Sequence, residues 1–216
     1  MPVMVPAKAD QAWRRGQAAQ WLIWHELARQ LGSGYRVFCN VAVRAGQAVD
    51  FVVQGPQGLV FLQTESAIAD VHVPAQPGVF WTLRTKNDYF AGSLDSGQLA
   101  ANARAVADAV NARLPPQFQG QARILGGGLL HVLPFTTTGF AHGLDLASAE
   151  RRVLFQSDIA ALDTWIDRAG AQAPAPPPPG PEAARRIAAA LGELARPRSS
   201  GWAEWGARLK ALFTQS

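Results

Sequence analysis

Cysteine is almost absent from this chain of 216 residues, in which Cys39 stands alone. A single cysteine excludes an intramolecular disulfide. Because disulfides are typical of oxidising compartments, its isolation predicts a reducing, cytoplasmic location. The surrounding stretch, residues 35–43, is apolar, which favours a small buried hydrophobic side chain over a catalytic nucleophile.

Long hydrophobic runs are also missing, because no stretch of about 18 apolar residues occurs that would predict a membrane-spanning helix. Residues 1–10 lack the positively charged start and apolar run of a secretory signal peptide. Lysine occurs only at positions 8, 86 and 210, whereas arginine and alanine are common. This bias predicts a bacterial source.

Charge is sparse and unevenly distributed along the chain. The net charge is +4, of which residues 182–216 contribute +3, so the remainder is nearly neutral. Non-specific affinity for DNA comes mainly from neutralising phosphates. Residues 1–181 therefore lack the charge for strong DNA binding alone, and the basic surplus belongs to the C-terminal segment.

The periodicity of apolar residues and the order of the predicted elements predict an α/β domain. Helices are predicted over residues 12–31, 93–114 and 158–169, the last with Ser157 as its N-cap. Strands are predicted over residues 35–43, 48–54, 59–64, 71–73, 79–83 and 122–133. The three consecutive glycines at 126–128 indicate a strand bulge or close backbone packing.

Proline dominates residues 173–181, which predicts an extended spacer between a domain over residues 1–172 and a tail over 182–216. A ligand for a proline-recognising domain is the alternative. Helices are predicted over residues 181–195 and 201–214. The second places a set of large apolar side chains on one face: Trp202, Trp205, Leu209 and Phe213. We expect this face to pack on the core or to dock on a partner.

Residues 50–66 combine two apolar strands, a tight turn and polar strand ends. Asp50 opens the first strand, and the second strand leads into Gln63 and Glu65 after the turn at residues 55–58. Side chains alternate along a strand, so Gln63 and Glu65 point the same way, and a hairpin brings them back beside Asp50. This pattern is typical of metal-dependent nucleases, although polar residues that only cap strand ends would give it too.

This segment resembles the central motif of the nuclease-related domain (NERD), a branch of the PD-(D/E)XK nuclease superfamily. The resemblance implies a mixed central sheet flanked by helices, which the predicted order of helices and strands suits. Asp50 matches the family's aspartate, and residues 63–65 stand where the family has Glu-x-Lys. The resemblance covers residues 13–115 and places Gln20 at the glutamate of the first helix. Trp81 and Gln98 match a common tryptophan and glutamine, but the family's Asn-Pro before that glutamine is absent.

The resemblance implies a site in which carboxylates hold Mg²⁺ or Mn²⁺ and a lysine assists. Here Gln20 and Gln63 replace two glutamates, and Glu65 replaces the lysine. Loss of one preorganised group costs on the order of 10²–10³ in rate. The resemblance therefore predicts a non-catalytic or weakly active nuclease homologue without a cofactor, which binds DNA or a DNA-processing protein.

Two alternatives remain open at this point. The chain could be an active metal-dependent DNA endonuclease using Asp50, Gln63 and Glu65, with Asp50 and Glu65 as the metal ligands. It could also be a protein-interaction or inhibitory module acting through its C-terminal helix. The four histidines, at 25, 72, 131 and 142, show no metal-ligand spacing.

Overall fold

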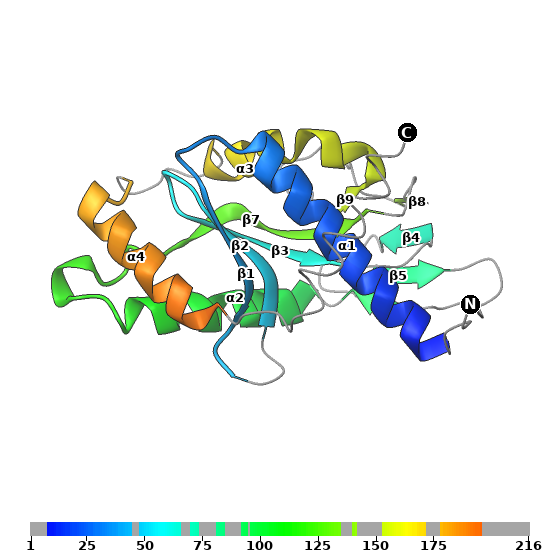
Figure 1. The fold of residues 1–216 in the computed structure, drawn as a ribbon, viewed down its shortest axis with the longest axis horizontal. Helices are drawn as coiled ribbons and strands as arrows, with labels where there is room; N and C mark the ends of the chain where they lie inside the picture. The colour runs from blue at the N-terminus through cyan, green and yellow to red at the C-terminus, as the bar shows by residue number, and fades with distance from the viewer. Residues whose placement is uncertain are drawn as a thin grey trace, which may run out of the picture.

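A mixed five-stranded sheet forms the centre of the computed structural model, with the strand order β1-β2-β3-β7-β9 (Figure 1). The structure describes residues 8–44, 48–65, 70–73, 81–84, 92–94, 96–134, 140–141, 153–171 and 178–195. The strands of this sheet are β1 (Arg36–Ala42), β2 (Ala48–Gln54), β3 (Leu59–Thr64), β7 (Ile124–Leu133) and β9 (Val153–Phe155). Strands β1 to β3 are antiparallel, and β7 and β9 continue from β3 in parallel. The predicted α/β class and mixed sheet are confirmed.

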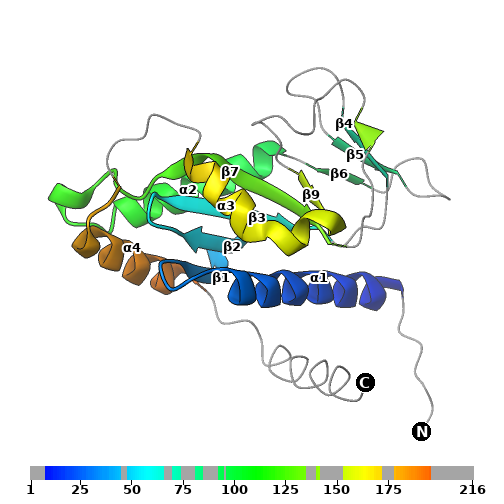
Figure 2. The same ribbon diagram turned by 90° about the horizontal axis from the view of Figure 1, so that it is seen from above.

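Two pairs of helices cover the two faces of this sheet (Figures 1 and 2). They are α1 (Lys8–Gln30), α2 (Ser96–Asn111), α3 (Leu162–Ala171) and α4 (Pro181–Leu194). Helices α1 and α3 share one apolar cluster with the sheet, in which Ile23 and Phe51 are fully buried. Helices α2 and α4 share the other, in which Val106 and Phe61 are fully buried. Two 3₁₀ helices, η1 (Pro116–Phe118) and η2 (Gln156–Ala161), precede β7 and α3.

A second, smaller sheet lies beyond one end of the large sheet (Figure 2). Its strands are β4 (Asp70–Val73), β5 (Trp81–Arg84), β6 (Gly92–Leu94) and β8 (Phe140–Ala141), in the order β6-β5-β4-β8. The short strands predicted over residues 71–73 and 79–83 correspond to β4 and β5, whose bounds differ from the predicted ones by one or two residues. None of the described helices is long and apolar enough to cross a membrane.

Helix α4 belongs to the hydrophobic core. It buries Ile187, Ala190, Leu191 and Leu194 against α2 and the sheet. The prediction that the proline-rich stretch holds the following segment away from the core is therefore wrong for α4. The amphipathic pattern of α4 carries an apolar stripe that only a packed neighbour can cover. The predicted helix over residues 201–214, with Trp202, Trp205, Leu209 and Phe213, lies outside the described residues.

The segment after β9 differs from the prediction that Ser157 is the N-cap of the following helix. Ser157 lies inside η2, which begins at Gln156, and α3 begins only at Leu162. Asp158 reaches back instead, and its Oδ2 accepts the backbone N–H of Phe155 at 2.8 Å. A carboxylate is a stronger acceptor for a backbone N–H than a serine hydroxyl, which explains why Asp158 takes the capping role.

Close backbone approach explains two of the glycines. A Cβ on Gly58 would lie 2.7 Å from Leu125 Cδ2 and 2.9 Å from the carbonyl oxygen of Arg123. A Cβ on Gly128 would lie 3.0 Å from the carbonyl oxygens of Leu125 and Leu59. Here the register between β3 and β7 shifts, so the interpretation of the glycine triplet as a bulge with close packing is confirmed.

Truncation of a core side chain in α4 tests its structural role. We expect Leu191→Ala to lower the free energy of unfolding by about 2–5 kcal/mol, because Leu191 is fully buried and its removal leaves a cavity. Denaturant unfolding measures the change. Glu193→Ala, at an exposed position of the same helix, should change it by less than about 1 kcal/mol. Equal effects of the two variants would contradict the packing of α4 on the core.

Candidate functional site

The candidate site lies where β2 and β3 separate. Their antiparallel ladder ends at the pair Phe51–Leu62, so the next residues, Asp50 and Gln63, no longer pair through the main chain. The Asp50 carboxylate fills the gap, and its Oδ2 accepts the backbone N–H of Thr64 at 2.9 Å. Asp50 is only 9% exposed, so this contact closes the end of the hairpin away from water.

Four donors converge on the Asp50 carboxylate. Its Oδ2 accepts from the Thr64 backbone N–H, the Thr64 hydroxyl and Gln63 Nε2, the last at 3.1 Å. Its Oδ1 accepts from Gln20 Nε2 of α1. A carboxylate offers about four lone-pair positions, so these donors meet its ordinary hydrogen-bonding capacity. The expected proximity of Asp50, Gln63 and the first helix is confirmed.

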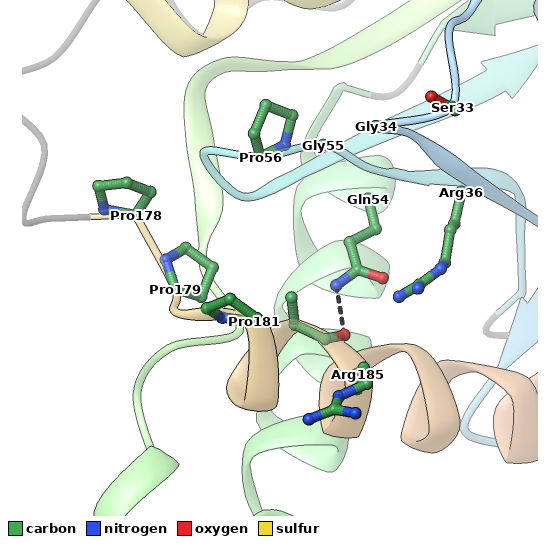
Figure 3. A pocket seen from close by; sticks show the side chains of 11 residues that line it. Ser33, Gly34, Arg36, Gln54, Gly55, Pro56, Pro178, Pro179, Pro181 and Arg185 are labelled. Atoms are coloured by element: carbon green, nitrogen blue, oxygen red, sulfur yellow. Dashed lines mark hydrogen bonds between the residues drawn. The ribbon is translucent and has the colours of Figure 1, made fainter.

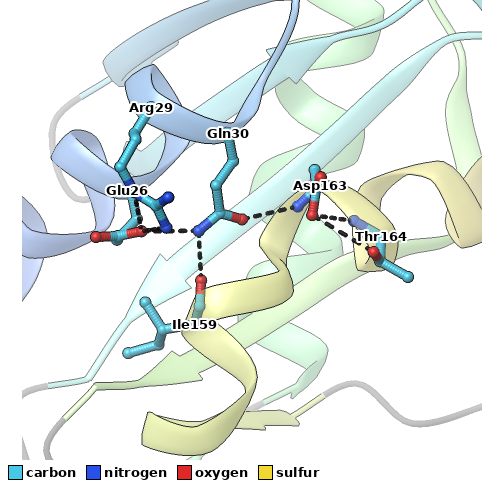
Figure 4. A network of polar contacts seen from close by, with 6 residues as sticks. All are labelled: Glu26, Arg29, Gln30, Ile159, Asp163 and Thr164. Carbon is cyan, nitrogen blue, oxygen red and sulfur yellow. Dashed lines mark hydrogen bonds and ion pairs between the residues drawn. The ribbon is translucent and has the colours of Figure 1, made fainter.

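A second polar network fixes the C-terminal half of α1 (Figure 4). Gln30 Nε2 donates to the carbonyl oxygen of Ile159 at 2.7 Å and to Glu26 Oε2 at 2.8 Å. Gln30 Oε1 accepts the backbone N–H of Asp163 at 3.3 Å. These bonds tie α1 to η2 and the start of α3. Because α1 is one continuous helix, this anchor also sets the position of Gln20 over Asp50.

Glu65 follows β3 and lies close enough to Asp50 to interact electrostatically. Its backbone N–H donates to the carbonyl oxygen of Val132 at 2.9 Å, which holds it beside β7. Burial, and then the negative charge of Asp50, raise the pKa of the Glu65 carboxyl from 4.5 to about 7. Near neutral pH, Glu65 is therefore protonated in a large fraction of molecules and cannot supply a full negative charge.

Gln98 occupies an exposed position in the first turn of α2. Its Nε2 donates to Asn102 Oδ1 at 2.8 Å, and Asn102 Nδ2 donates to the carbonyl oxygen of Ala48 at 3.3 Å. Gln98 is thus linked through Asn102 to the start of β2, two residues before Asp50. Its predicted role at the site stays a prediction.

His131 is a neighbour of the site that the sequence reasoning missed. It lies opposite Gln63 in the parallel pairing of β3 with β7 and is 3% exposed. The spacing of the histidines in the sequence could not predict this position. His131 comes to lie opposite Gln63 only because a long crossover connects the parallel strands β3 and β7. The available signal was a polar residue inside the apolar run of residues 129–133.

The donor arrangement does not fit Mg²⁺ or Mn²⁺. These ions take oxygen ligands, ordinarily from carboxylates. An ionised carboxylate only accepts hydrogen bonds, so Gln20 and Gln63 present their amide nitrogens to Asp50 and not their oxygens. Within the described residues, no three His, Cys, Asp or Glu side chains are grouped to hold a metal ion.

Comparisons of the chain with protein-family models, with curated proteins and with solved structures give no match.

Replacement of Asp50 tests the hydrogen-bond network. We expect Asp50→Asn to lower the free energy of unfolding by about 1–3 kcal/mol, because an amide nitrogen would then face buried N–H donors. Denaturant unfolding provides the measurement. Asp108→Asn makes the same change at an exposed position of α2 and should alter stability by less than about 0.5 kcal/mol. An Asp50→Asn protein as stable as this control would contradict a structural role for the carboxylate.

Glu65 predicts a characteristic pH dependence. Its pKa is raised from 4.5 to about 7 on folding, so the folded state binds more protons than the unfolded state between these values. Stability should therefore fall as the pH rises through this interval, with a slope set by that proton difference. Glu65→Gln should remove this contribution. Unfolding curves of both proteins at several pH values measure it, and parallel pH profiles would show that Glu65 has an ordinary pKa.

Proposed function

We propose that this chain is a non-catalytic or weakly active relative of the PD-(D/E)XK nucleases, of the nuclease-related type, which acts by binding DNA or a DNA-processing protein. The observation that carries the proposal is the set of four protein donors on the Asp50 carboxylate. The α/β sheet and the hairpin with Asp50 at its open end support the nuclease relationship.

The chemistry of these positions supports loss of catalysis. Metal-dependent hydrolysis of a phosphodiester needs carboxylate oxygens that are open to a metal ion. At this site the Asp50 oxygens accept bonds from Gln20, Gln63 and Thr64. The position of the assisting lysine holds Glu65, a carboxyl group that cannot offset developing negative charge.

The distribution of charge supports binding to DNA through the C-terminal segment. In α4, Arg185 and Arg186 both pair with Glu182, and Glu193 pairs with Arg113 of the loop after α2. The arginines and glutamates of residues 182–195 balance, so the whole surplus of +3 lies in residues 196–216. That segment would supply the phosphate contacts, whereas the domain near Asp50 supplies a folded anchor.

Cleavage and binding can be measured on one fluorescently labelled DNA duplex. We expect no cleavage with Mg²⁺ or Mn²⁺, because the Asp50 oxygens are occupied by protein donors. Binding should weaken steeply with salt. A tail variant with Gln at positions 196, 198, 208 and 210 should lower the magnitude of the salt slope by up to about four units, since each phosphate contact contributes about 0.9.

The matched control removes four cations elsewhere and carries Gln at positions 29, 104, 113 and 168. It should keep the salt slope of the natural chain. Cleavage that disappears on Asp50→Ala would overturn the proposal in favour of an active nuclease. A chain that binds no DNA even at low salt would assign the binding role to a protein partner. Weak cleavage gained by Gln63→Glu with Glu65→Lys would support descent from a nuclease.

A further inference from the structure

A cavity of about 800 Å³ opens at the other end of β2, away from Asp50. It lies between the turn at Gly55 and Pro56, the start of β1, and the N-terminus of α4 (Figure 3). Gln54 in its wall and Asp50 are four residues apart on one strand, which corresponds to about 13 Å. A cavity of this size falls in the range of small-molecule sites, and it is separate from the site already described.

Positive charge lines this cavity. Arg36 is exposed, and its guanidinium has no ion-pair or hydrogen-bond partner in the described part of the chain. Arg185 lines the opposite wall, and it shares the carboxylate of Glu182 with Arg186. One carboxylate thus serves two guanidiniums, and no carboxylate of the described residues pairs with Arg36. An anion entering the cavity meets a net positive wall.

The N-terminus of α4 adds to this preference. The helix is 14 residues long, and its N-cap is Gly180, which has no side chain to accept the first backbone N–H groups. Pro181 has no N–H and the Ala184 N–H donates to the carbonyl oxygen of Gly180 at 2.9 Å, so the contribution of α4 is its helix dipole, whose positive end attracts anions. The one acid of the first turn, Glu182, has both carboxylate oxygens engaged by Arg185 and Arg186.

Gln54 supplies an independent sign of a ligand. It is 5% exposed, and its Nε2 donates to the carbonyl oxygen of Ala184 at 2.8 Å. Its Oε1 is buried and has no hydrogen-bond partner among the described residues. Figure 3 shows this oxygen turned to the Arg36 side of the cavity. Buried polar atoms are almost always paired, so this acceptor, although closed to solvent, is one that a ligand hydroxyl or N–H would satisfy.

We propose that this cavity binds a phosphate monoester of mononucleotide size. Arg36 and Arg185 hold the phosphate, in the bidentate manner that guanidinium groups favour, and the positive end of the α4 dipole attracts it. A hydroxyl or N–H of the ligand donates to Gln54 Oε1. The apolar rings of Pro56 and Pro179 cover one side of the ligand. This binding requires neither nuclease activity nor the basic segment after α4.

Isothermal titration of the full chain with the 5′-monophosphates of adenosine, cytidine, guanosine and uridine tests the proposal. We expect at least one to bind with a dissociation constant below about 1 mM. The matching nucleoside, which lacks the phosphate, should bind at least about tenfold more weakly, because it leaves the charged donors without a partner. Arg36→Gln should weaken nucleotide binding by at least about tenfold for the same reason.

Arg113→Gln is the matched control, since it removes the same charge outside the cavity and should leave nucleotide affinity within about twofold. Gln54→Met keeps the side-chain length but removes the unpaired acceptor, so it should also weaken binding once a thermal melt shows a folded protein. If that variant does not fold, the exposed Arg36→Gln decides the question. No binding by any nucleotide, equal binding of nucleoside and nucleotide, or equal affinity of the Arg36 and Arg113 variants would overturn the proposal.

Discussion

The Asp50 carboxylate is the interaction on which the arrangement of the hairpin and α1 depends. It receives donors from β3 through Gln63 and Thr64 and from α1 through Gln20, so one buried side chain joins a helix to two strands. A buried carboxylate is expensive unless its lone pairs are satisfied, and here the protein satisfies them. The same bonds that stabilise this corner occupy the oxygens that a metal ion would need. A metal ion at Asp50 would therefore have to displace these hydrogen bonds.

Local pattern was sufficient to predict the hairpin and the meeting of Asp50 with Gln63. The register of a tight hairpin is set by its turn, so residues equidistant from residues 55–58 must come together. The prediction that Gln20 belongs to the site came from the family resemblance. Periodicity alone does not predict its contact with Asp50, which lies 30 residues further along the chain. In contrast, His131 reaches Gln63 through a parallel crossover that no short-range pattern specifies.

The docking of α4 could not be predicted from composition. The composition of a proline-rich stretch does not indicate whether the helix after it is free or packed on the domain. Only the apolar stripe of α4 indicated packing. Its partners, such as Val106 of α2 and Val41 of β1, are distant in sequence. The raised pKa of Glu65 and the unpaired oxygen of Gln54 were hidden for a related reason, because both arise from burial created by several segments at once.

The position of α4 beside β1 also bears on aggregation. Strand β1 forms one edge of the large sheet, and an uncovered edge offers backbone groups to strands of other molecules. Asn40 interrupts the regular backbone of this edge with a φ of 51°, and Val41 forms a bridge with Ala195 just after α4. The end of α4 thus covers part of the edge strand and limits its pairing with strands of other molecules. A chain cut before α4 would expose both an apolar face and a free strand edge, which favours self-association over a stable shorter domain.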